Sequence, residues 1–327
     1  MILDTYDRQH TYLRISLTDL CNLRCAYCMP DEEYDFMPTS HLMQPEEIEA
    51  IAKIFVSLGV DKIRLTGGEP LARRDFTNIL GRLAQLPVEL SLTTNATLLH
   101  RHINTIEAAG LRNLNISLDT LSREKFRKLT HRDLFDQTFR NIGLAIERGL
   151  NVKINMVVMK GVNEGEILEF IQWTRDQPIG VRLIEFMPFA GNRWKDAQMF
   201  SRKEMLELIR ADYPIEELPV PKHSTSSVFQ IPGHRGNFGM ISTMSAPFCA
   251  GCNRMRLTAD GKMKNCLFSK DETDLLSALR NALPLEPLIR QNIFGKEEKL
   301  GGQFGDKPID QLDGDQLINR SMISIGG

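Results

Sequence analysis

Strand-like and helical segments alternate along about the first 190 residues of this 327-residue chain. Short runs rich in β-branched and apolar residues are separated by longer runs in which apolar residues recur every three or four positions, the spacing of one helix face. The strand-like runs are residues 12–17, 62–66, 89–93, 113–118, 152–158 and 181–186. Such a succession predicts a parallel sheet, because parallel neighbours must be joined by a crossover and a helix normally provides it. The sequence thus indicates an α/β fold, either an open doubly wound sheet or a full or partial barrel.

The regular alternation of strand-like and helical segments ends after about residue 190. The helical runs before this point are residues 45–58, 75–83, 135–148 and 166–175. Those after it are residues 202–210, 274–283 and 287–293, with a strand-like alternation over residues 254–263. From Gly295 the chain is rich in Gly and Asp and is predicted to be irregular. We therefore predict two parts, residues 1–190 and residues 191–327.

Composition and charge argue against several classes of protein. The formal net charge is −2, whereas a non-specific nucleic-acid binder needs an excess of cations to neutralise phosphates. No apolar run approaches the roughly 18 residues of a membrane span, and the first residues lack the basic and apolar pattern of a secretion signal. We therefore expect a cytoplasmic protein with no nucleic-acid or membrane partner, in which thiols stay reduced.

Six cysteines form two sets of three that are far apart in the chain. They are Cys21, Cys25 and Cys28 in the first set and Cys249, Cys252 and Cys266 in the second. Three thiolates are one short of closing a tetrahedral zinc site or of ligating every iron of a cubane iron–sulfur cluster. Each set is therefore predicted to hold a metal centre with one open position. Disulfides and zinc sites with a distant fourth ligand are the less favoured alternatives.

Glycines and polar residues gather where the predicted strands end, which is where active sites of parallel α/β folds lie. Gly67-Gly68-Glu69-Pro70 follows the second strand, Thr93 and Ser117 close the third and fourth, and Met187 follows the sixth. Several separate segments of the chain are thus predicted to meet at one edge of the sheet.

Three basic residues, Arg14, Arg64 and Lys153, lie within predicted strands. A buried charge is costly unless it has a partner. Basic side chains that point into one barrel lumen would suit a polyanion such as a triphosphate. Each of them could instead reach water from a strand end or pair with a carboxylate. A P-loop motif is absent from the sequence, so a nucleotide would be held in another way.

The motifs resemble those of a known family. C-x3-C-x-Y-C followed by Gly-Gly-Glu-Pro resembles the radical S-adenosylmethionine (SAM) superfamily. The second cysteine motif, which contains Arg254 and Arg256, is similar to that of the GTP 3′,8-cyclase family of molybdenum cofactor biosynthesis. The segments around Ser117, Lys153 and Met187 agree with that family, as does the final Gly326-Gly327. The resemblance extends from about Thr11 to the last residue.

The resemblance implies a fold and a set of residue roles. Residues 1–190 would form a partial (βα)6 TIM-type barrel of the radical SAM type, and residues 191–327 a C-terminal α+β extension that closes its open side. A first [4Fe–4S] cluster, which binds SAM, would be held by Cys21, Cys25 and Cys28. The rest of the SAM pocket would be Tyr27, Gly68, Ser117 and Met187. A second [4Fe–4S] cluster, which meets the guanine of GTP, would be held by Cys249, Cys252 and Cys266. Residues that bind GTP would be Arg14, Arg64, Thr93, Lys153, Arg254, Arg256, Gly326 and Gly327.

The resemblance also implies a lyase reaction. A 5′-deoxyadenosyl radical from SAM would take the C3′ hydrogen of the GTP ribose, and the carbon radical would close a ring onto guanine C8. A further electron and proton, with help from Arg254 or Arg256, would complete 3′,8-cyclo-7,8-dihydro-GTP, the first intermediate of molybdopterin synthesis. Implied partners are a low-potential electron donor of flavodoxin or ferredoxin type and the next enzyme, cyclic pyranopterin monophosphate synthase. Whether the protein forms a homodimer stays open.

Two other functions stay open at this point, and the chain differs from the family pattern at one position. The chain could be a radical SAM enzyme that modifies a peptide, or a non-catalytic scaffold with two structural zinc ions. The family often has Thr-Thr-Asn-Gly where this chain has Ala96 after Asn95. Alanine is a mild change there unless the position needs a positive φ.

Overall fold

Six parallel strands form the centre of the sheet in the computed structural model, which describes all residues except 31–33, 305–310, 313, 315–316 and 327. They are β1 (Tyr12–Ser16), β2 (Lys62–Thr66), β3 (Glu89–Thr94), β4 (Asn113–Ser117), β5 (Asn151–Val158) and β6 (Gly180–Glu185). They pair in chain order, each parallel to the next. All six predicted strands are confirmed, and the observed ends differ from the predicted ones by at most one residue.

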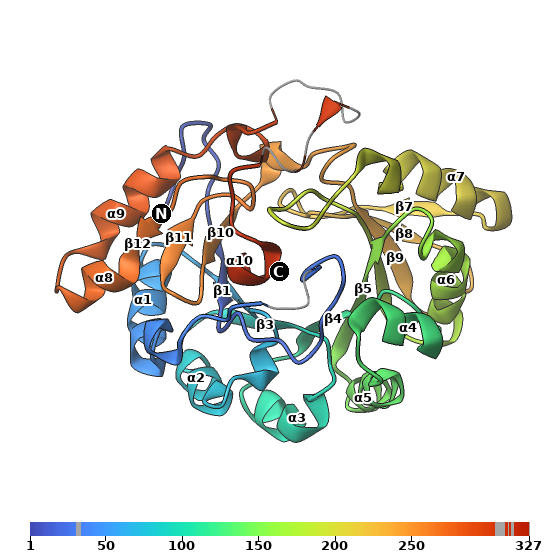
Figure 1. Cartoon of the computed structure of the whole chain (residues 1–327), viewed down its shortest axis with the longest axis horizontal. Helices are drawn as coiled ribbons and strands as arrows, with labels where there is room; N and C mark the ends of the chain where they lie inside the picture. Colours follow the sequence, from blue (N-terminus) through green and yellow to red (C-terminus); the bar gives the residue numbers. More distant parts are fainter. Residues whose placement is uncertain (31–33, 305–310, 313, 315–316, 327) are drawn as a thin grey trace.

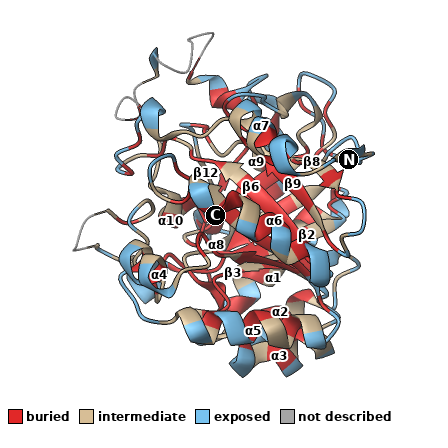
Figure 2. Ribbon diagram, turned by 90° about the vertical axis from the view of Figure 1, so that its right-hand side faces the viewer, coloured by how far each residue is buried: buried red, intermediate tan, exposed pale blue. Residues whose placement is uncertain are grey.

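Helices cover the outside of this sheet (Figure 1). Those between the central strands are α1 (Pro45–Ser57), α2 (Phe76–Leu83), α3 (Leu99–Ala108), α4 (Arg123–Thr130), α5 (Phe135–Glu147) and α6 (Ile167–Asp176). Their inner faces are buried and their outer faces are exposed, as Figure 2 shows. The sequence pattern misses α3 and α4. Only three residues of α3 and two of α4 are buried, so the helical periodicity of apolar residues is weak there.

The C-terminal region extends the same sheet at both edges. Three strands lie beyond β6, namely β9 (Asn237–Ile241), β8 (Ser227–Gln230) and β7 (Glu216–Leu218). Three more lie beyond β1, namely β10 (Arg254–Leu257), β11 (Lys262–Lys264) and β12 (Thr273–Asp274). Both β9 and β10 pair parallel with their central neighbours. Among the described residues, the sheet has 12 strands, ends at β12 and β7 and is not closed, which confirms an α/β fold with a partial TIM-type barrel. The division at residue 190 stays a prediction.

Two parts of the C-terminal region differ from the prediction. The single strand predicted over residues 254–263 is a hairpin, since β10 ends at Leu257 and β11 returns antiparallel to it. The Thr258 hydroxyl, which accepts from the Lys262 amide at 3.0 Å, closes this turn. The end of the chain, predicted to be irregular, contains the short helix α10 (Met322–Ile325), which lies inside the curve of the sheet (Figure 1).

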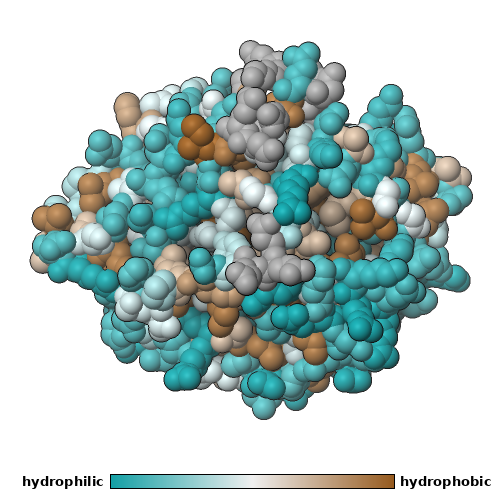
Figure 3. Space-filling model, in the orientation of Figure 1, coloured by the Kyte–Doolittle hydropathy of each residue, from teal (hydrophilic) through white to brown (hydrophobic). Residues whose placement is uncertain are grey.

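The other helices of this region are α7 (Arg202–Asp212), α8 (Leu275–Arg280) and α9 (Leu285–Phe294), all of which were predicted. Apolar side chains are scattered among hydrophilic ones on the face that Figure 3 shows. Within the described part of the chain, no helix combines the length and the apolar character that a membrane span requires.

Candidate active site

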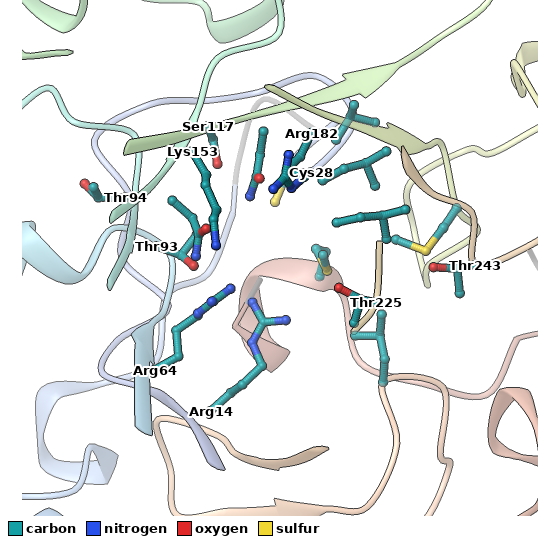
Figure 4. Close-up of a pocket in the computed structure, with 18 of the residues that line it drawn as sticks. Arg14, Cys28, Arg64, Thr93, Thr94, Ser117, Lys153, Arg182, Thr225 and Thr243 are labelled. Carbon is teal, nitrogen blue, oxygen red and sulfur yellow. The ribbon is translucent and has the colours of Figure 1, made fainter. Parts of the chain in front are cut away.

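A cavity of about 690 Å³ lies inside the curve of the sheet and extends along the central strands to their carboxyl ends. Its size is within the usual range of small-molecule sites, roughly 300–1,000 Å³. Figure 4 shows Arg14, Arg64 and Lys153 projecting from three strands into this space, with Cys28 and Ser117 on its wall. The residues that the sequence pattern placed at the strand ends are therefore brought together.

All three cysteines of the first set line this cavity, on the loop that follows β1. Burial, and then the charge of the nearby Cys21, raises the pKa of Cys28 to about 12. Burial likewise raises the pKa of Cys25, and both Cys21 and Cys28 add to this effect. The three thiols are thus close enough to act on one another. Three thiolates in this position require a bound cation or cluster.

Two backbone hydrogen bonds attach the first cysteine loop to the end of α4. The Arg24 amide donates to the Thr130 carbonyl, and the Ala26 amide donates to the Leu129 carbonyl, each at 2.9 Å. These bonds hold the loop over the mouth of the sheet even though it contains no regular secondary structure.

The Gly-Gly-Glu-Pro turn packs directly on the backbone that leads to Cys21. A Cβ atom on Gly68 would lie 2.5 Å from the carbonyl oxygens of both Asp19 and Leu20, so only glycine fits. The Gly68 amide donates to the Thr18 carbonyl at 2.6 Å, and the Glu69 amide donates to the Leu20 carbonyl at 2.8 Å. The turn and the cysteine loop therefore form one wall of the cavity.

The carboxylate of Glu69 is fully buried beneath this wall. It accepts hydrogen bonds from the Leu71 amide (3.0 Å), the Thr94 hydroxyl (2.6 Å) and the Asn95 amide (2.7 Å). Burial raises the pKa of Glu69 to about 7, although these bonds act in the opposite direction. The Asn95 side chain also donates to Cys21 Sγ at 3.9 Å, so Glu69 links the end of β3 to the first cysteine set.

The residues predicted for the SAM pocket share the cavity with the first cysteine set. Tyr27, Gly68, Ser117 and Met187 all line it. The Tyr27 hydroxyl donates to Asp119 Oδ2 at 2.8 Å, and Asp119 Oδ1 accepts from the Val157 amide at 2.8 Å. Burial raises the pKa of Asp119 to about 6. Asp119, to which the sequence assigned no role, thus fixes the ring of Tyr27.

Three arginines lie side by side across neighbouring strands. The strand register pairs Arg14 of β1 with Arg256 of β10 on one side and with Arg64 of β2 on the other. All three line the cavity. Like charges in directly opposite positions repel each other. This arginine row (Arg14, Arg64 and Arg256) therefore creates a positive electrostatic potential in the cavity. A bound anion would reduce the repulsion between the three side chains.

Further cations extend the arginine row. Lys153 is open to the cavity, and its pKa is lowered to about 8, first by partial burial and then by the charges of Arg182 and Arg64. Arg182 and Lys62 also line the cavity, although the sequence did not single them out. The seven cations of the lining are Arg14, Lys62, Arg64, Lys153, Arg182, Arg254 and Arg256. Among the described lining residues, Asp119 is the single carboxylate. Thr93, on β3, lies between these cations in the lining.

The second cysteine set lies beside the cavity, at the base of the β10–β11 hairpin. Cys249 is in the 3₁₀ turn Cys249–Gly251, Cys252 directly precedes β10, and Cys266 follows β11. Burial raises the pKa of Cys249, and the nearby Cys266 and Cys252 act in the same direction. These thiols do not line the cavity themselves, but Arg254 and Leu267 next to them do.

Cys252 differs from the cysteines of the first set in its surroundings. Both Arg254 Nη2 and Lys296 Nζ donate to its Sγ, each at 3.6 Å. Burial by itself raises the pKa of Cys252. The charges of Lys296 and Arg254 outweigh this effect and lower the pKa to about 6. The Arg254 guanidinium also lies 4.7 Å from the ring centre of Phe248. Arg254 therefore connects the second cysteine set to the cavity.

The donor chemistry of the two sets fits iron–sulfur clusters. Each set offers three soft thiolates, the donor type that holds iron–sulfur clusters. In the described ranges, no three His, Cys, Asp or Glu side chains are grouped as ligands of one metal ion. A cubane cluster takes each thiolate on a different iron, so the thiols around it stand farther apart than those around a single ion.

The last described segment of the chain reaches the cavity, where Met322 and Ile323 of α10 line it. Gly326, which is buried and has φ +85°, accepts a hydrogen bond from Arg256 Nη1 on its carbonyl at 3.1 Å. A Cβ atom on Gly326 would lie 2.6 Å from Ser16 Cβ and 2.9 Å from Thr66 Oγ1. Gly326 therefore docks at the ends of β1 and β2, whereas Gly327 lies outside the described residues.

Known proteins match this chain along nearly all of its length. The Radical SAM superfamily model matches residues 15–174, and the Molybdenum Cofactor Synthesis C model matches residues 179–301. A GTP 3′,8-cyclase of Alkaliphilus oremlandii (strain OhILAs) is 39% identical over 330 residues, which cover 99% of both chains. The chain belongs to the GTP 3′,8-cyclase family of radical SAM proteins. The cofactors of a radical SAM protein are SAM and iron–sulfur clusters.

Other relatives of this GTP 3′,8-cyclase family member are longer. The mitochondrial GTP 3′,8-cyclase of Arabidopsis thaliana is 44% identical over all of this chain and 84% of that protein. Molybdenum cofactor biosynthesis protein 1 of Mus musculus is 46% identical over 99% of this chain and 51% of that protein. The chain spans about half the length of several curated relatives that it matches.

Solved structures share the fold of this family member. The crystal structure of Streptococcus suis SuiB has a TM-score of 0.59 and 18% identity, over 86% of this chain and 68% of that one. Methylornithine synthase (PylB) has a TM-score of 0.50 and 21% identity, over 62% of each chain. At such low identity these likenesses show the fold alone.

Proposed function

We propose that this chain is a lyase that converts GTP to 3′,8-cyclo-7,8-dihydro-GTP, the first step of molybdenum cofactor biosynthesis. The observation that carries the proposal is one cavity with the arginine row in its wall, the first cysteine set lining it and the second set beside it. A triphosphate is a polyanion that would relieve the repulsion between these cations. The relatives named GTP 3′,8-cyclase support the same substrate.

The first cysteine set would hold the cluster that binds SAM. When bound, the cluster supplies the electron that cleaves SAM reductively. Tyr27, held by Asp119, would present a fixed ring to the adenine of SAM. Gly68 would leave room for the methionine part, because it has no side chain. Ser117 and Met187 would complete the pocket.

The cations would bind and orient GTP. Arg14, Arg64, Arg256 and Lys153, with Thr93, would hold its phosphates, and Arg182 and Lys62 would add to them. A cluster held by the second cysteine set would meet the guanine at the other end of the molecule. With both ends anchored, the ribose between them has little freedom, which selective removal of one hydrogen requires. A carbon radical attacks most C–H bonds, so enclosure in the cavity also prevents side reactions.

Arg254 and Arg256 would act in the last step. Arg254 touches Cys252 of the second set, and Arg256 touches the carbonyl of Gly326. A cation at this point would stabilise negative charge as the cyclised radical takes up one electron, which comes from the low-potential donor, and one proton to become the product. Gly326 and Gly327 would bring the chain terminus close to the substrate without a side chain in the way.

The test is the formation of 5′-deoxyadenosine by anaerobically reconstituted protein with SAM and dithionite, with and without GTP. GTP-dependent formation is expected. SAM cleavage that is indifferent to GTP would favour a peptide-modifying enzyme, and no cleavage by fully iron-loaded protein would contradict a catalytic role.

A pair of variants adds residue-level information to this test. Arg64→Met should raise the KM for GTP at least about tenfold, since one charge-assisted phosphate contact contributes about 1.5–3 kcal/mol. Arg101→Met removes the same charge from the exposed side of α3 and should leave the KM unchanged.

The same proposal covers the partners and the location of the protein. An electron donor of flavodoxin or ferredoxin type would reduce the clusters, and cyclic pyranopterin monophosphate synthase would receive the product. We propose a cytoplasmic location, while the oligomeric state stays open.

A further inference from the structure

A buried lysine lies against the second cysteine set. Lys296, which follows α9, is only 4% exposed. Its Nζ donates to Cys252 Sγ at 3.6 Å and to the Arg254 carbonyl at 3.1 Å. Burial of an ammonium group is costly unless anionic or strongly polar partners compensate for it. The partners of Lys296 are thus a cysteine of the second set and the backbone beside it.

The two cysteine sets differ in their charged neighbours, since the first has two carboxyl groups and one arginine, Arg24, beside it, whereas Cys252 of the second lies against two cations. In the second set, Cys252 receives hydrogen bonds from two cations, Lys296 and Arg254. In the first set, Cys21 receives one from the neutral amide of Asn95. The nearby carboxyl groups are Glu69, which acts on Cys21, and Asp119, which acts on Cys25 and Cys28.

The position of Lys296 is held by the N-terminal segment. Arg8 donates to the carbonyls of Glu297 (2.9 Å) and Glu298 (2.6 Å), which directly follow Lys296, and to the carbonyl of Cys249 (3.1 Å). One guanidinium therefore joins the segment of Lys296 to the turn that carries a cysteine of the same set. The lysine is fixed relative to the thiols rather than free to turn toward water.

We infer that Lys296 is a positioning residue that raises the reduction potential of a cluster held by Cys249, Cys252 and Cys266. A cation next to a cluster favours the reduced form, which carries one more negative charge, and hydrogen bonds to its sulfurs act in the same direction. In this step the low-potential donor loses one electron and the cluster gains it. This inference rests on the proposed function only in that the second set holds an iron–sulfur cluster.

The experiment is a redox titration of the second cluster, followed by electron paramagnetic resonance. Cys21, Cys25 and Cys28 are replaced by Ser in the full-length chain, so that one cluster gives the signal. In this background, Lys296→Met should lower the ratio of reduced to oxidised cluster at a fixed potential at least about tenfold, which is about 59 mV for a one-electron couple. Lys296→Arg, which keeps the charge, should restore most of the ratio.

Two further variants separate the causes of the shift. Lys296→Gln keeps a hydrogen-bond donor but not the charge, and we expect it to shift the ratio in the same direction as Lys296→Met. It also serves as the test if the Met variant loses its iron. Lys203→Met removes the same charge from an exposed side chain of α7 and should leave the potential unchanged.

The outcomes are distinguishable. A second cluster with the same potential in Lys296→Met and Lys296→Gln as in the parent would overturn the inference and leave the proposed function intact. If the second set holds no iron in the parent, the inference fails together with the proposed second cluster. That result would leave untouched the proposed cleavage of SAM by the chain in which the first cysteine set is intact.

Discussion

Ala96 shows how one residue can occupy a backbone conformation that it disfavours. It is fully buried and has φ +59°, in the left-handed region. The Thr94 hydroxyl accepts from its amide at 3.0 Å, and Asn141 donates to its carbonyl at 2.6 Å. This position therefore does need a positive φ, so Ala in place of the Gly that is common in the family introduces backbone strain.

We predict that Ala96→Gly changes the free energy of unfolding by less than about 1 kcal/mol, since relief of about 1–2 kcal/mol of backbone strain offsets a lost methyl contact of about 0.8 kcal/mol. Ala145→Gly is the matched control, because it removes the same buried methyl from the helix α5 with no strain to relieve. It should cost about 2 kcal/mol. Urea unfolding measures both, and equal losses would contradict this account.

Lys153 should make GTP binding depend on pH. Its pKa is lowered to about 8, mainly by burial, so the side chain loses its charge as the pH rises through that value. The affinity for GTP should therefore fall about tenfold between pH 7 and pH 9. Lys153→Arg stays charged over this range and should bind with little change. Calorimetric titration without reductant measures binding alone, and an identical pH dependence in both proteins would exclude Lys153 as its cause.

At the scale of elements, the segment before β1 supports the second cysteine set. Asp4 Oδ2 accepts from Arg8 Nε at 2.6 Å and lies 3.0 Å from His10 Nε2, and all three side chains are buried. Arg8 in turn reaches the carbonyls of Cys249 and Glu298. A short segment without regular structure thus joins two loops that are distant from it in the chain.

Arg8→Met should release both of these loops. The loss leaves the buried Asp4 carboxylate without the guanidinium that pairs with it, so we expect a cost of about 3 kcal/mol in unfolding free energy. Hydrogen exchange should accelerate at residues 249–252 and 296–300, and the additional change Asp4→Asn should recover part of the stability. Arg123→Met breaks an exposed ion pair with Asp133 and should cost less than about 1 kcal/mol. Unchanged exchange in the two loops would contradict this role of Arg8.

At the scale of the whole molecule, both ends of the chain meet at the same strands. β1 lies between β2 and β10, and Gly326 docks where β1 and β2 end. The C-terminal region also borders β6 through β9. The cavity is therefore assembled from segments that span nearly the whole chain, and a change at the last residues should affect its chemistry more than its stability.

Gly326→Ala should strongly reduce GTP-dependent formation of 5′-deoxyadenosine. The new Cβ would overlap Ser16 and Thr66, and the positive φ would be strained. Gly165→Ala is the control, since nothing lies within 4 Å of a Cβ at that position. Both variants should unfold within a few degrees of the parent, about the shift that 1 kcal/mol causes in a chain of this size. Full activity of Gly326→Ala would show that the docked tail is dispensable.

The local sequence determined the elements and the reactive groups. The six central strands, most helices and the two cysteine motifs follow from residue type and spacing over a few neighbouring positions. Each of these patterns lies within one short stretch of sequence, so it can be recognised without knowledge of the rest of the chain. The three strand cations Arg14, Arg64 and Lys153 were recognisable for the same reason, since a charge in a buried strand is unusual wherever the strand lies.

Tertiary structure alone decided which of these groups meet. Arg256 joins Arg14 and Arg64 only because β10 pairs with β1, and Thr11 bonds Asn253 across 242 positions of the chain. Lys296 carried no signal of its own, because one Lys after a helix is common on any surface. Arg182 lies within the predicted strand 181–186, so the rule that singled out the other strand cations applied to it as well, but it was overlooked. Their significance comes from the cavity and the thiol beside them. Pairing between distant strands depends on how the whole sheet curves, which no short stretch of sequence encodes.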